Sequence, residues 1–198
     1  MADRSVALVL TAAGAAHRDT GSRLFPGVPS VSLTREEFRP REPFRGRLFG
    51  LLGSQPRGVV VALVVPVVRA EGAEDQPAAS GDVGGPTVPI ADHVDLEACG
   101  PLTGRWPTGV PRDFPSMTGI YQPGLVRPPG GARVYSSGVV AAGVADVRRL
   151  TRFEARAVRE GGWPVTTDSL VPAAIVAAYY GLRLAACGVL QAVRSDRE

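Results

Sequence analysis

Lysine and asparagine are absent from this chain of 198 residues, so all 22 of its basic side chains are arginine. This absence excludes Schiff-base lysine chemistry, a phosphate-binding loop with a lysine, and recognition of a nucleobase by asparagine. Both missing residues have A-rich codons, so the composition is typical of a GC-rich bacterial genome. The net charge of +3 is small and the arginines are scattered along the chain. We therefore expect no binding to nucleic acid.

Cysteine and histidine are also scarce, with two of each. Two cysteines in a chain of this length are typical of a reduced, cytoplasmic protein and do not indicate a disulfide framework. Two histidines far apart, without a Cys/His cluster, predict no metal site, and the sequence indicates no cofactor. Charge-free apolar stretches such as residues 58–68 are too short to cross a membrane.

What is present predicts a single globular domain over residues 1–198, because 44% of the residues are hydrophobic and 21% are charged. A tight turn at 11–16 is expected, and Pro66 should lie at the end or edge of its strand. A helix with Phe153 on its apolar face is predicted at 146–162 and a second helix at 171–180, and loops are predicted at 69–86 and 97–131. Strands are predicted from apolar runs at residues 5–10, 47–52, 58–68, 87–96, 132–144, 163–167 and 182–193. This alternation indicates an α/β fold with a largely parallel central sheet.

Three blocks of the sequence carry a family resemblance. The first contains GDV (81–83), DHVDL (92–96), PLTG (101–104) and RDFPSMTGIY (112–121); the second is TRFEARAVREGG (151–162); the third is DSLVPAAIVAAYYGLRL (168–184). In this order they resemble the trimeric purine nucleoside phosphorylase and methylthioadenosine phosphorylase family, in which the third block reads MST-VPE-IVA and then GLRV. The resemblance implies a three-layer fold with helices on both sides of a mixed sheet, a small-molecule ligand and a homotrimer. The chain would be a shortened member, abridged near residues 72–81 and at the carboxyl terminus.

The phosphate site that this resemblance implies is incomplete. The family has a serine in a Gly-Ser-Gly turn after the first strand, where this chain has TAAGAA (11–16). Pro66 and Val68 stand where the family has an Arg-x-His pair; if residues 58–66 match a later strand instead, the Arg-His segment is missing. Ser169 is the matching phosphate ligand that remains. Because an anion needs several converging donors, we expect no ordinary phosphorolysis.

The implied base and ribose contacts also differ. The family's Phe-Glu pair falls on Arg149-Leu150, or on Phe153-Glu154 if about one helical turn is deleted from the alignment. The methionine that lies under the ribose becomes Asp168. Loss of such preorganised groups predicts a large loss of transition-state stabilisation for the family reaction.

Two residues are candidates for acid–base catalysis. Asp168 is either a helix cap or a carboxylate on the floor of the pocket. His17 follows the first turn and faces either the former phosphate region or solvent. The candidate ligand-binding residues are Ser169, Phe114, Tyr121, Glu154 and His93.

Alternatives remain open for three of these ligand candidates. In the family, the phenylalanine of the RFP-M segment enters the neighbouring subunit's pocket, so Phe114, with Tyr121, either completes a site between protomers or packs on its own core. His93 belongs to a motif that is mostly structural in the family, and Glu154 is alternatively a salt-bridged helix residue.

Two functions are therefore compatible with the sequence. One is a repurposed enzyme that carries out a cyclisation, elimination or hydrolysis of a small molecule in bacterial specialised metabolism. The other is a catalytically silent chain that binds a nucleoside-like ligand or a partner chain.

Overall fold

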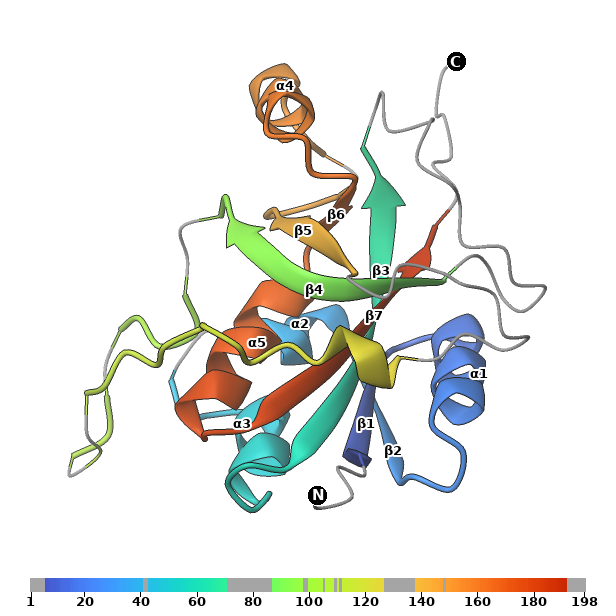
Figure 1. Cartoon of the computed structure of the whole chain (residues 1–198). Coiled ribbons are helices and arrows are strands. Elements are labelled where there is room, and N and C mark those ends of the chain that lie inside the picture. Colours follow the sequence, from blue (N-terminus) through green and yellow to red (C-terminus); the bar gives the residue numbers. More distant parts are fainter. Residues whose placement is uncertain are drawn as a thin grey trace.

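The computed structural model describes residues 6–40, 43–70, 87–97, 100–104, 106–108, 110, 112–126, 138–147 and 149–191 (Figure 1). Within these ranges the strands are β1 (Val6–Ala12), β2 (Ser30–Leu33), β3 (Val60–Arg69), β4 (Thr87–Asp95), β5 (Val139–Gly143), β6 (Val165–Thr167) and β7 (Arg183–Leu190). The helices are α1 (Ala15–Leu24), α2 (Arg35–Phe38), α3 (Arg47–Gly53), α4 (Arg152–Glu160) and α5 (Leu170–Tyr179), with the short 3-10 helix η1 (Pro123–Leu125).

The strands form one mixed sheet in the order β2-β1-β3-β6-β5-β4-β7, and β7 also pairs with β3. Strands β3, β6, β5, β4 and β7 therefore form a closed ring, from which β1 and β2 extend. The β3–β6 and β4–β7 pairs are antiparallel, and the other pairs are parallel. The predicted mixed, largely parallel sheet is confirmed.

Pro66 lies inside β3 rather than at its end, and the strand pairing explains how the sheet accommodates it. The carbonyl of Val67 accepts a hydrogen bond from Gln191, next to β7, so the neighbouring Pro66 nitrogen faces the opposite side of β3. On that side, pairing with β1 ends at Val64 and pairing with β6 begins at Val68. The missing N–H thus falls in the interval between two partner strands, where it costs no ladder hydrogen bond.

Helices cover both faces of the sheet (Figure 1). On one face, Leu10 and Leu63 pack with Phe38, Leu48 and Leu170 in the larger apolar cluster, beneath α2, α3 and α5. On the other, the smaller cluster combines side chains of β1, β3 and β7 with those near the end of α1; its members include Val9, Val64, Leu24, Phe25 and Cys187. Helices on both sides of a central sheet are the expected arrangement.

Several predicted elements differ from the structure. Residues 47–52 form α3 instead of a strand, because Leu48, Phe49 and Leu52 follow helical spacing and are buried together. Elements α1, β2 and α2 were not predicted. The helix predicted over 146–162 begins only at Arg152, and Phe153, expected on its apolar face, is 79% exposed.

The predicted strand over 132–144 is observed from Val139, and residues 127–137 lie outside the described parts. The same holds for most of the predicted loop at 69–86, which includes the GDV block, and for Cys99. Among the helices that the structure describes, none has the length and apolar character needed to cross a membrane.

Candidate functional site

The polar residues that follow β6 form the centre of the candidate site. The Asp168 side chain is only 7% exposed, and its Oδ2 accepts a hydrogen bond of 2.8 Å from the Arg35 Nε. The buried Ser169 hydroxyl donates to Asp168 Oδ1 over 2.8 Å. Ser169 occupies the N-cap position of α5, yet its side chain makes no capping hydrogen bond. Asp168 is therefore an ion-paired carboxylate, and the capping role predicted as one alternative is wrong.

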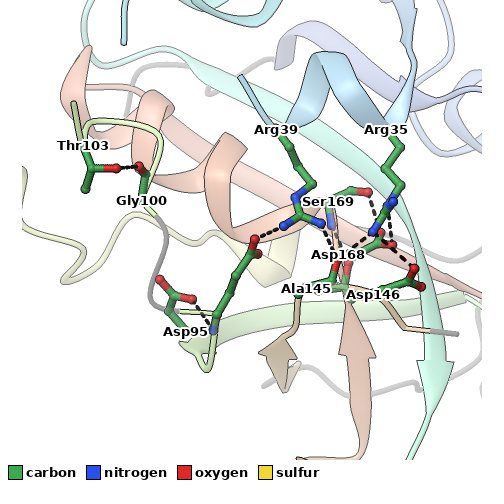
Figure 2. A network of polar contacts seen from close by, with 11 residues as sticks. Arg35, Arg39, Asp95, Gly100, Thr103, Ala145, Asp146, Asp168 and Ser169 are labelled. Carbon is green, nitrogen blue, oxygen red and sulfur yellow. Dashed lines mark hydrogen bonds and ion pairs between the residues drawn. The ribbon is translucent and has the colours of Figure 1, made fainter. Parts of the chain in front are cut away.

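Helix α2 and its C-cap residue supply two arginines to this site, Arg35 and Arg39 (Figure 2). The Arg35 Nη2 donates to the Ala145 carbonyl over 2.6 Å and lies 3.8 Å from the Asp146 carboxylate. Arg39 donates to the same carbonyl and pairs with Glu97. We refer to Arg35, Arg39, Asp146, Asp168 and Ser169 as the arginine–aspartate cluster. It joins α2, which follows β2, to the chain segments that leave β5 and β6.

The sheet explains why polar groups gather at this point. Helix α2 begins directly after β2 with a capping box, in which the Thr34 side chain and the Glu37 side chain each bond to the other's backbone N–H. β1 and β6 pair with the same side of β3 but run in opposite directions, so their carboxyl ends face one another across the interval at Pro66. Loops that follow strand ends at such an interval commonly carry functional side chains.

His17 lies outside this cluster. It belongs to α1, which packs on the opposite face of the sheet from α2 and α5, and it is buried. Its Nε2 lies 3.3 Å from the Gln191 side-chain nitrogen, and its Nδ1 has no hydrogen-bond partner within the described parts of the chain. Burial lowers the pKa of His17. The imidazole is therefore neutral at neutral pH and does not share a site with Asp168.

His93 and Tyr121 form a second polar pair. The His93 Nδ1 and the Tyr121 hydroxyl are 2.7 Å apart, and the pair links β4 to the segment that bridges to Leu184 of β7. Burial lowers the pKa of His93, although Asp92 and Asp95 oppose that shift, and burial raises the pKa of Tyr121. Both groups are therefore neutral at neutral pH.

Comparison with known proteins rests on the fold. No protein-family model matches the sequence, and no curated protein matches it. The chain superposes on methylthioadenosine phosphorylase from Schistosoma mansoni without ligand, with a TM-score of 0.62 and 11% identity, over 97% of this chain and 82% of that one. For the same enzyme in complex with adenine, the TM-score is 0.60 and the identity 10%, over 94% and 82% of the two chains. The chain has the nucleoside phosphorylase fold.

Two further ligand candidates, Phe114 and Glu154, lie at the surface or at a helix end. Phe114 is 84% exposed, so the alternative that it packs on its own core is wrong. Glu154 caps α4: its Oε2 accepts from the Thr151 backbone N–H at 2.7 Å and from the Thr151 hydroxyl at 2.8 Å, and these bonds lower its pKa. A helix-residue role for Glu154 was anticipated, although its partner is a threonine and not a basic residue.

Arg35 and Arg39 were not predicted as site residues from the sequence. A signal was present, since TREE (34–37) directly follows the alternating polar and apolar residues SVSL (30–33) and has the spacing of a capping box. Among the described residues, no group of three or more histidine, cysteine, aspartate or glutamate side chains is arranged to hold a metal ion.

Proposed function

We propose that this chain is an enzyme that binds a small molecule on the nucleoside phosphorylase fold and transforms it by acid–base chemistry without phosphorolysis. The observation that supports this is the buried Asp168 carboxylate, held by Arg35 and Ser169. A positioned carboxylate can take a proton from a substrate as a general base. The Arg35 side chain is 42% exposed, which leaves one side of the pair open to solvent. Cyclisation, elimination and hydrolysis are the reaction classes that this chemistry serves.

The same contacts argue against phosphorolysis. β1 ends at Ala12 and the turn after it contains Ala13 and Gly14, so the turn offers no hydroxyl to a phosphate. The Ser169 hydroxyl and the Arg35 Nε, which are groups suited to anion binding, already bond to Asp168. We therefore expect the reaction to proceed without inorganic phosphate.

Asp168→Asn is expected to lower turnover by about 10²- to 10⁴-fold, since the amide keeps the size of the side chain but cannot accept a proton. The test is to incubate the wild-type protein and the variant with a metabolite extract from a GC-rich bacterium. Consumption of individual components is then followed by mass spectrometry. Glu160→Gln, on the exposed surface of α4, is the control and should leave turnover unchanged.

Two results would contradict this proposal. Brisk release of hypoxanthine from inosine and phosphate would mean that phosphorolysis persists. If the wild-type protein consumes no component, the proposed enzymatic function is wrong. The result would then favour a catalytically silent chain that binds a nucleoside-like ligand or a partner. One observation favours that second function: both Asp168 oxygens are already engaged within the chain.

We further propose that the chain forms a homotrimer in the cytoplasm, with Phe114 and Tyr121 at a site shared between protomers. The support is the 84% exposure of Phe114, since a large apolar side chain left in solvent favours burial against another surface.

Phe114→Ser is expected to shift the assembly toward monomers, because it removes apolar area of the order of 150 Å² from the contact. Light scattering coupled to size-exclusion chromatography, at protein concentrations near the dissociation constant, measures this shift. Phe153→Ser is the matched control, since Phe153 is also exposed but lies on α4. Equal masses for the wild-type protein and Phe114→Ser would contradict the proposed contact.

A further inference from the structure

Arg35, Asp168 and Ser169 have the arrangement of an anion-binding site that already contains its anion (Figure 2). One carboxylate oxygen accepts from the Arg35 guanidinium and the other from the Ser169 hydroxyl, each over 2.8 Å. Proteins hold free oxyanions such as formate and phosphate with the same donors. We propose that the Asp168 carboxylate is a built-in anion, so that this site accepts an uncharged ligand and excludes an anionic co-substrate.

Attachment to the chain gives Asp168 an advantage over a free anion. Its carboxylate competes for Arg35 as an intramolecular group, with an effective concentration at least of the order of millimolar. The side chain is nearly fully buried at the start of α5, so a free anion would have to displace it and leave a carboxylate unpaired.

The charges around the cluster also disfavour an anionic ligand. Arg35 and Arg39 face the carboxylates of Asp168, Asp146 and Glu97. Among these ion pairs of the described residues, two guanidinium groups face three carboxylates, so the pairs themselves carry no positive excess to attract a further anion. Within the described residues the Arg35 Nη1 makes no hydrogen bond, so it remains as a donor for a carbonyl or hydroxyl oxygen of an uncharged ligand.

This inference rests on the proposed function, because it names the ligand class of the same site, but its test needs no substrate. Isothermal titration calorimetry with sodium formate and with inorganic phosphate, at constant ionic strength, measures anion binding to the full chain. Asp168→Ala should bind formate at least about tenfold more tightly than the wild-type protein, because Arg35 and Ser169 are released. Asp168→Asn is the isosteric control and should gain no binding, since its amide fills the space.

The double variant Arg35→Met/Asp168→Ala identifies where the anion binds, and it should lose the gain. The proposal is overturned if the double variant keeps the increased formate affinity, or if folded Asp168→Ala binds formate no more tightly than the wild-type protein. It is also overturned if the wild-type protein binds phosphate as tightly as Asp168→Ala does. Asp168→Ser, which also shortens the side chain, replaces Asp168→Ala if circular dichroism indicates that the alanine variant is unfolded.

Asp146→Asn added to Asp168→Ala should tighten formate binding further, since Asp146 is the competing carboxylate for Arg35. Unchanged or weaker formate binding after that addition would contradict this assignment.

Discussion

Arg35→Met is expected to lower the free energy of unfolding by about 2 kcal/mol. Among the described residues, the substitution leaves the buried Asp168 carboxylate with only the Ser169 hydroxyl as its partner. Breaking a fully buried ion pair costs about 3–5 kcal/mol, but the Arg35 side chain is 42% exposed, so solvent screens part of the interaction. Urea unfolding followed by circular dichroism at neutral pH measures the difference.

Two further variants separate the ion pair from other effects of the substitution. Arg35→Met/Asp168→Met should regain most of the lost stability, because neither charge then remains unpaired. Arg156→Met breaks the exposed pair between Arg156 and Glu160, whose atoms lie 2.7 Å apart within α4, and should cost less than about 0.5 kcal/mol. If Arg35→Met costs no more than Arg156→Met, the Arg35–Asp168 contact does not support the fold.

Gly143→Ala is expected to lower the free energy of unfolding by about 1–3 kcal/mol. A Cβ at this last residue of β5 would lie 2.3 Å from the Val171 Cγ2 and 3.3 Å from the Val94 carbonyl oxygen. The first turn of α5 would have to move away from β5, and Asp168 and Ser169 immediately precede that turn. We therefore expect lower stability, measured by urea unfolding, together with weaker ligand binding, measured by calorimetry.

Gly50→Ala is the matched control for this substitution. Gly50 lies in α3, and a Cβ there meets no atom within 4 Å. Alanine should stabilise that helix by up to about 1 kcal/mol, since glycine is the poorer helix former. Wild-type stability for Gly143→Ala would mean that Val171 moves without cost, contrary to its close approach to Gly143.

The sequence predicted the fold best where long apolar stretches are buried on both sides. Strands β3, β4 and β7 and helix α5 lie where their patterns indicated. Residues 47–52 were interpreted as a strand because a run of six residues, most of them apolar, is too short to distinguish a strand from a helix. The joint burial of Leu48, Phe49 and Leu52 and the contact with α5 identify this segment as α3. Phe153 was assigned to the apolar face of a helix that was predicted to begin at residue 146. The observed helix α4 begins at Arg152, so Phe153 lies in its first turn, and Val158 is the one residue of α4 that is buried.

The candidate site was predictable only in part. Asp168 and Ser169 were recognised from the polar residues before an apolar helix, and both are buried. Their partner was not recognised, because Arg35 is separated from Asp168 by 133 positions and no local pattern joins two such distant residues. The position of His17 was not predictable for the same reason. No local pattern shows which face of the sheet α1 covers, and α1 lies on the face opposite to α2 and α5.

The closed ring of strands also limits how this sheet can meet another one. Every described strand except β2 has neighbours on two sides, so β2 alone presents unpaired backbone groups along its length. It is only four residues long and carries Ser30 and Ser32, features that discourage strand addition and aggregation. Copies of this protein would therefore associate through loops and side chains, and hydrogen-bonded extension of the sheet from one molecule to the next is disfavoured.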